Sequence, residues 1–232
     1  MTGHVLRPGY SRRDTLLANP FEGVDLDAFP EGAKSAVLHR DNHECQACGF
    51  ASDRFCEIVA AVDPAFLAED YVTLCRACWL FENLDRAAML NAAAFIWAPE
   101  LSQLEINRAA PILYTERLSK TSKARPAIEN LLKTLKERRQ RANREFGVGP
   151  EDDMLKILSR DGGSIRPVDD VIEKLSGGVR LWPLDRWIER AGQYEYNTYH
   201  SMLAYWRRMI PTSEPGNYGA NAITQDWLAR LG

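Results

Sequence analysis

Four of the five cysteines in this 232-residue chain form two Cys-x-x-Cys pairs, Cys45 with Cys48 and Cys75 with Cys78. Thiolates suit zinc, and a Cys-x-x-Cys turn can bring two sulfurs to one metal at about 2.3 Å each. Gly49 follows the first pair directly, where a metal-binding turn needs a residue that tolerates a left-handed backbone. The pattern predicts one structural Zn2+ bound by four thiolates.

Two other interpretations of the paired cysteines compete with zinc. Four unrelated buried cysteines do not usually arrive as two close pairs, and a redox-active Cys-x-x-Cys needs only one pair with an exposed, low-pKa thiol. An odd number of cysteines does not suit a disulfide framework. Zinc is therefore preferred. Cys56, in an apolar segment, is expected to be a small core residue, and His43 a neighbour of the site and not a ligand.

The composition is that of a soluble protein able to form a core. Hydrophobic residues make up 45% of the chain, and no apolar run approaches the roughly 20 residues that span a bilayer. No apolar segment of a signal peptide follows the N-terminal charges, so a cytoplasmic protein is expected. The formal charge of −3 disfavours a nucleic-acid function, because phosphate contacts require cations.

Short strands and several helices are expected to position the cysteines, which makes the fold class α+β and mostly helical. Apolar and β-branched runs predict strands over 55–62 and 71–74, with a short extended piece at 94–97. Ser102 and Glu105 form a capping-box pattern, which predicts a helix that begins at Ser102. Pro111 is expected to bend or interrupt this helix. Helices are expected over 33–40, 76–91, from 102, 126–146, 152–159 and 168–175.

Residues 39–41, 45–49 and 74–78 together resemble the zinc-binding frame of HNH endonucleases. The resemblance implies a ββα-metal, treble-clef-like module in which zinc pins a hairpin to a helix. Active members place Asp-His at the end of the first hairpin strand and His or Asn after the second Cys-x-x-Cys. Here residues 60–64 read Ala-Ala-Val-Asp-Pro, and Trp79 follows Cys78.

The departure from the HNH pattern predicts that the chain is not an enzyme. No histidine lies between His43 and His200, so no imidazole is expected near the metal to take a proton from water. Glu57 and Asp63 could bind a cation, although a solvated carboxylate and a turn residue are preferred. A divergent HNH endonuclease acting on DNA stays open as the alternative.

A narrower resemblance is to the IcmJ family, also called DotN. Residues 42–50 and 57–59 carry it, and the distinctive part is the Pro-Glu-Leu-Ser-Gln-Leu-Glu-Ile-Asn stretch, 99–107. The resemblance implies a cytoplasmic, non-catalytic adaptor of the Dot/Icm type IVB secretion system. It also implies as partners the C-terminal tail of the type IV coupling ATPase and other coupling-complex subunits, indirect association with the inner membrane, and no nucleic acid.

Three regions are expected along the chain: an irregular arm (1–30), an HNH-like four-cysteine zinc module (31–118) and a helical region packed on it (119–232). The helical region is rich in cations and aromatic side chains, which favour protein interfaces. A solvated helix face explains the cations slightly better than a partner interface does. Core packing likewise explains the aromatic side chains slightly better. The residues expected at a partner interface are Trp187, Tyr199, Trp206, Arg138 and Arg141.

Overall fold

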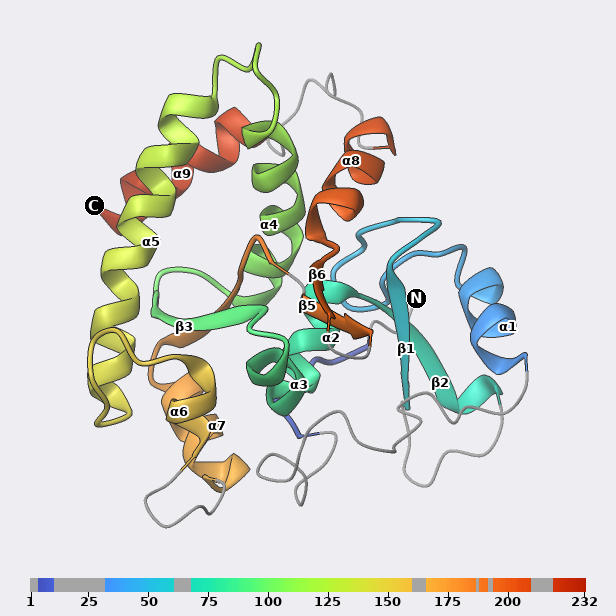
Figure 1. Ribbon diagram of the computed structural model, residues 1–232, viewed down its shortest axis with the longest axis horizontal. Helices are drawn as coiled ribbons and strands as arrows, with labels where there is room; N and C mark the ends of the chain where they lie inside the picture. The colour runs from blue at the N-terminus through green and yellow to red at the C-terminus, as the bar shows by residue number, and fades with distance from the viewer. Residues whose placement is uncertain are drawn as a thin grey trace.

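The computed structural model describes residues 4–10, 32–60, 68–159, 166–186, 188–191, 194–209 and 219–232. Within these parts of the chain, helices surround three separate two-stranded antiparallel sheets, so the expected α+β class is confirmed (Figure 1). None of the described helices is both long and apolar enough to cross a membrane.

The first hairpin joins β1 (Cys56–Ala60) to β2 (Tyr71–Cys75), and Ile58 lies opposite Thr73. Helix α1 (Ala33–Arg40) and the short 3-10 helix η1 (Ala68–Asp70) flank it on one side of the molecule (Figure 1). Val37, Ile58 and Tyr71 form a small buried cluster between α1 and the hairpin. Both strands lie where the sequence predicts them, and residues 61–67 fall outside the described chain.

The single helix expected over 76–91 is in fact two helices, α2 (Arg76–Glu82) and α3 (Leu84–Met89). The chain leaves helical geometry at Asn83, whose φ and ψ are −130° and 65°. The Asn83 side chain donates to the carbonyl of Trp79 over 2.8 Å, and the amide of Leu84 donates to the carbonyl of Gly9 over 2.8 Å. These two bonds replace continued helical bonding, which explains why the uninterrupted helix was wrong.

A second sheet lies inside the helical half. Strand β3 (Ala93–Trp97) pairs with β4 (Val179–Pro183), and Phe95 lies opposite Leu181. Helices α4 (Gln103–Arg117), α5 (Arg125–Glu145) and α9 (Ala220–Leu231) pack around this sheet and against one another (Figure 1). One continuous core runs from the cysteine pairs into these helices, and the division at residue 118 stays a prediction.

The predicted capping box at the start of α4 is confirmed. The Ser102 hydroxyl accepts from the amide of Glu105, whose carboxylate accepts from the amide of Ser102. The helix continues through Pro111, so Pro111 does not interrupt it, and a bend at this residue stays a prediction. Proline removes a single N–H from the helix, and the buried neighbours Ala110 and Leu113 hold the turn against the core.

The remaining elements complete the helical half. Helix α5 carries Pro126 in its first turn, as predicted. The short helices expected over 152–159 and 168–175 are also present, as α6 (Met154–Leu158) and α7 (Val168–Ser176). The last part of the chain contains a small third sheet, in which β5 (Ile188–Ala191) pairs with β6 (Tyr194–Asn197), and two helices, α8 (Tyr199–Met209) and α9.

Candidate metal centre

The first cysteine pair lies in a tight turn that precedes the hairpin. An isolated bridge between Glu44 and Ala51 closes the turn, and the amide of Cys45 donates to the carbonyl of Phe50 over 2.9 Å. The amide of Gly49 donates back to the carbonyl of Cys45, and Gly49 has a φ of 74°. A left-handed residue costs glycine little, so the predicted role of Gly49 is confirmed.

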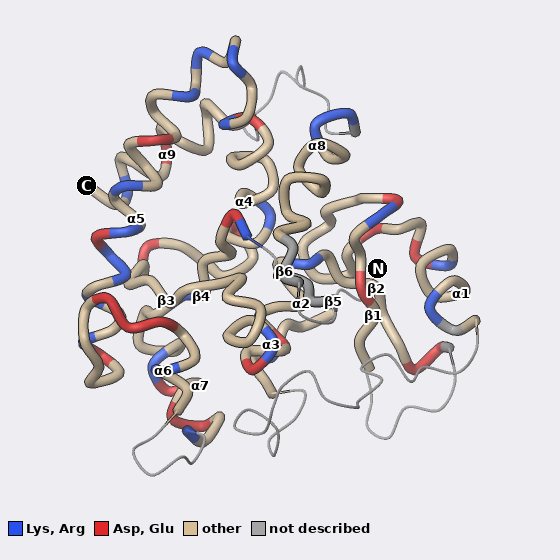
Figure 2. The backbone as a smooth tube through the Cα atoms, viewed as in Figure 1, with Lys and Arg blue, Asp and Glu red and all other residues tan. Residues whose placement is uncertain are grey.

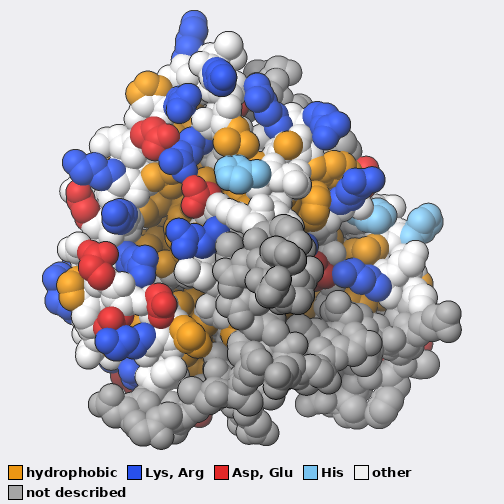
Figure 3. Space-filling view, in the orientation of Figure 1, with side chains coloured by type: hydrophobic (Ala, Val, Ile, Leu, Met, Phe, Trp, Pro, Cys, Tyr) orange, Lys and Arg blue, Asp and Glu red, His pale blue; other side chains and the backbone are white. Residues whose placement is uncertain are grey.

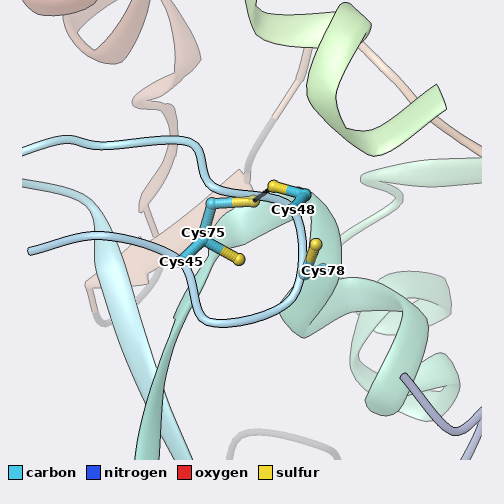
Figure 4. A group of neighbouring side chains, drawn as sticks. All are labelled: Cys45, Cys48, Cys75 and Cys78. Carbon is cyan, nitrogen blue, oxygen red and sulfur yellow. Dashed lines mark hydrogen bonds between the residues drawn. The ribbon is translucent and has the colours of Figure 1, made fainter. Parts of the chain in front are cut away.

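The second pair lies where the hairpin becomes a helix. Cys75 is both the last residue of β2 and the N-cap of α2, and Cys78 follows in the first turn of that helix. The amide of Gln46 donates to the carbonyl of Thr73 over 2.9 Å, which joins the turn to β2 just before Cys75. Local backbone geometry therefore points both pairs toward one place (Figure 4).

The four sulfurs lie within 4.8 Å of one another, and those of Cys48 and Cys75 are 3.6 Å apart. Four ligands at the usual zinc–sulfur distance would place neighbouring sulfurs about 3.8 Å apart. Cys48 is half-buried and the other three are buried, and none forms a disulfide. The set could hold one metal ion and is compatible with a tetrahedral zinc site.

The thiols share charge unevenly. Hydrogen bonds from Cys48, Cys75 and Cys78 lower the pKa of the Cys45 thiol. Hydrogen bonding with Cys45 and burial raise the pKa values of Cys75 and Cys78. A divalent cation would supply the positive charge that allows buried cysteine sulfurs to ionise together.

A buried amide also reaches the cluster. Asn107, which is 0% exposed, donates from Nδ2 to Sγ of Cys78 over 3.4 Å. Its Oδ1 accepts from Nε2 of Gln103 over 2.8 Å. The same Gln103 amide donates to the carbonyl of Leu181 and accepts from its amide. The distinctive stretch 99–107 thus connects β4 to a candidate metal ligand, a role that spacing alone does not indicate.

Other candidates near the centre have structural contacts. Cys56 donates to the carbonyl of Ser52 over 3.4 Å, and burial raises its pKa to about 12, so it stays a thiol outside the cluster. His43 is half-buried and is not among the clustered residues. Glu57 accepts from Lys34 over 2.6 Å and lies 3.6 Å from Arg76. Asp63 lies outside the described residues.

The aromatic residues expected at a partner interface are part of the core where they are described. Trp206 is 3% exposed, its indole donates to the Ser52 hydroxyl over 3.0 Å, and its ring packs edge-on against Phe50. Tyr199 is 5% exposed and packs edge-on against Tyr114. Trp187 lies outside the described residues, and partner binding by these three residues stays a prediction.

The two arginines expected at the same interface also have partners within the chain. Arg138 donates to the carbonyl of Trp97 over 3.0 Å and to the Glu100 carboxylate over 2.8 Å. The guanidinium of Arg141 lies 4.3 Å from the centre of the Trp97 ring. Both side chains therefore help to fix α5 on β3, and their part in partner binding stays a prediction.

A cleft of about 630 Å3 opens beside the cysteine cluster, between the first cysteine turn, α4 and α9. Cys48 of the first cysteine turn and Trp227 of α9 are both among its lining residues. Leu104, which is 43% exposed, gives the cleft an accessible apolar residue. Charged side chains, namely Glu105, Arg108 and Asp226, also line it. An apolar cleft with charged residues suits a peptide segment better than a small polar substrate.

Comparison with known proteins gives one curated relative. No family model matches the chain. The chain is similar to the type 4 apparatus protein DotN of Legionella pneumophila subsp. pneumophila, with 26% identity over 185 residues. The alignment covers 72% of this chain and 82% of DotN.

Proposed function

Because this chain belongs to the IcmJ (DotN) family, we propose that it is a zinc-stabilised, non-catalytic adaptor of a type IVB secretion coupling complex. Its part in that complex would be to help recruit effector proteins to the coupling ATPase. The observation that carries the proposal is the contact between Asn107 and Cys78, because it connects the family's distinctive stretch to the four-cysteine cluster. The metal then stabilises the scaffold on which a partner docks.

Zinc is the proposed ion because the ligands are four clustered sulfurs from two Cys-x-x-Cys pairs. Cys75 and Cys78 start α2, whereas Cys45 and Cys48 lie in the preceding turn, so one ion would hold the turn, hairpin and helix together. We expect one zinc per chain by elemental analysis of purified protein. A folded sample without stoichiometric zinc would contradict this assignment.

The cleft beside Cys48 is the proposed docking place for a segment of the coupling ATPase. A flexible tail that folds on binding can fill an apolar cleft while remaining separable from the motor domain. The accessible Leu104 and the charged residues Glu105, Arg108 and Asp226 offer such a tail both apolar and polar contacts. The adaptor would then lie at the cytoplasmic face of the inner membrane through its partners.

Affinity purification from the native cell tests this proposal. The coupling ATPase, identified by mass spectrometry, is expected to co-purify with the tagged chain and to be lost with Leu104→Asp. Leu155→Asp is the matched control, because Leu155 is also an exposed leucine but lies outside the cleft. If the ATPase is never recovered, the adaptor proposal is wrong; if both variants retain it, the cleft is not the docking place.

The proposal also includes the absence of nuclease activity. Glu57 is held by Lys34 and Arg76, and Trp79 stands where an active HNH nuclease would place histidine or asparagine. A zinc ion with four sulfur ligands has no open position for water. Supercoiled plasmid incubated with Mg2+ or Mn2+ should stay intact. Cutting that Glu57→Ala abolishes in a folded protein would establish the endonuclease alternative.

A further inference from the structure

Two segments that are distant in the sequence meet at one end of the molecule. Arg207, near the end of α8, donates to the Ser119 hydroxyl in the loop between α4 and α5 over 3.4 Å. Lys and Arg positions cluster at the ends of these segments in Figure 2, and their side chains line the same edge in Figure 3. We call this end the cationic tip, formed by Lys120, Lys123, Arg125, Arg207 and Arg208, all of which are exposed.

Among the residues that the structure describes, no carboxylate pairs with a cation of the cationic tip. Two nearby carboxylates, those of Glu129 and Asp185, both bind Arg117, at 2.8 and 3.0 Å. Arg207 donates to the Ser119 hydroxyl and Arg208 to the carbonyl of Ala204 in its own helix, both neutral acceptors. No ion pair within the described parts of the chain involves the five cations of the tip. The whole chain has a formal charge of −3, so the positive charge of this end is opposite in sign to the net charge of the protein.

An exposed leucine lies beside these cations. Leu118, the C-cap of α4, is 38% exposed at the start of the loop that carries Lys120 and Lys123. A leucine side chain makes no favourable contact with water or with the phosphates of a nucleic acid. It can be buried at the boundary between lipid headgroups and acyl chains, where cations and apolar side chains act together.

We propose that the cationic tip binds the anionic headgroups of a lipid bilayer, with Leu118 entering the interfacial layer. The cations come from two elements at one end of the molecule, which suits a flat surface. A duplex binder would need cations extended along a groove and would leave Leu118 unused. The inference goes beyond the adaptor role, because it requires no other protein. It would give the chain a direct contact with the membrane.

Co-sedimentation of the full chain with vesicles tests the proposal. Binding is expected to vesicles of phosphatidylcholine with phosphatidylglycerol, and not to phosphatidylcholine alone, and it should weaken with salt. Each cation near an anionic surface contributes about fivefold to partitioning. The triple variant Lys120→Gln, Lys123→Gln, Arg208→Gln should therefore bind roughly 100-fold more weakly.

Matched variants separate the tip from overall charge. Lys133→Gln, Lys136→Gln, Arg144→Gln removes the same charge from exposed positions of α5 beyond the tip and should leave most binding intact. Leu118→Ser should lower binding about fivefold, whereas Leu155→Ser, at another leucine that is 38% exposed, should not.

Several results would overturn the proposal. Equal binding to neutral vesicles would remove the role of the charges. Equal losses in the two triple variants would mean that overall charge, and not the tip, governs binding. A duplex DNA or an acidic peptide that binds the tip more tightly than the anionic vesicles, with Leu118→Ser without effect, would assign the surface to a different partner.

Discussion

Replacement of Asn107 by leucine should weaken metal binding without unfolding the protein. Asn107 is fully buried and its amide nitrogen donates to Sγ of Cys78 over 3.4 Å, so it would stabilise the negative charge of a metal-bound Cys78 thiolate. Leucine has a similar volume but no donor. Its introduction also leaves the Gln103 side chain bonded to the backbone of Leu181, so the helix–strand contact persists.

The magnitude follows from the kind of bond that is lost. A hydrogen bond to a charged group contributes about 1.5–3 kcal/mol. Removal of a group that orients a metal ligand usually costs about 10- to 100-fold in metal affinity. We therefore expect zinc affinity to fall about 10- to 100-fold in Asn107→Leu, and further in Asn107→Asp, because a carboxylate would repel the thiolate that the amide stabilises.

The assay is competition for zinc with a chromophoric chelator, supported by the absorption spectrum of the Co2+-substituted protein. Asn143→Leu is the matched control: Asn143 is also fully buried, but it donates to the carbonyls of Gly149, Pro150 and Asp152 and does not contact the cluster. It should lower the free energy of unfolding and leave zinc affinity unchanged. A folded Asn107→Leu with the zinc affinity of the parent would refute the reasoning.

Three further predictions concern stability. Cys75→Ser should abolish stoichiometric zinc and lower the thermal midpoint sharply, measured by elemental analysis and calorimetry, because metal binding and folding are coupled in such sites. Arg138→Ala should lower the free energy of unfolding in urea by about 1–3 kcal/mol, since it leaves a carbonyl and a carboxylate without their donor. Burial opposes ionisation of Glu105, but hydrogen bonds from Arg230 and Ser102 outweigh it and lower its pKa to about 2. In the unfolded chain the pKa of a glutamate is about 4.3. Ionised Glu105 therefore adds to the free energy of unfolding above that pH, and this stabilisation is lost as the pH falls toward 2. In Arg230→Ala, the free energy of unfolding measured in urea should decline less over that range.

The cysteine cluster could be predicted because each pair is local. A Cys-x-x-Cys turn with Gly49 and a pair at a strand–helix junction each constrain their own geometry, whichever helices surround them. The strands 56–60 and 71–75 were also predictable from local sequence, because each is an apolar run rich in strand-forming residues. The capping box of Ser102 and Glu105 likewise involves residues only three positions apart.

The features that the sequence did not indicate depend on contacts between distant residues. Asn107 could not be assigned to the metal centre, because its partner Cys78 is 29 positions away and on another helix. The break at Asn83 depends on a hydrogen bond from the amide of the next residue to the carbonyl of Gly9, and helical periodicity does not predict a bond to so distant a residue. The pairing of β3 with β4 was missed because its partners, such as Phe95 and Leu181, are far apart in the sequence.

The pairing of β3 with β4 also has a consequence for the order of folding during synthesis. All four cysteines have emerged from the ribosome once α2 is complete, so the metal can be loaded early. The hydrogen bond from Gln103 to the carbonyl of Leu181 cannot form until Leu181, 78 residues later, has been synthesised. Contacts of such separation close slowly. We therefore expect a metal-bound nascent chain whose α4 face and β3 edge stay open until the last third of the protein has been made.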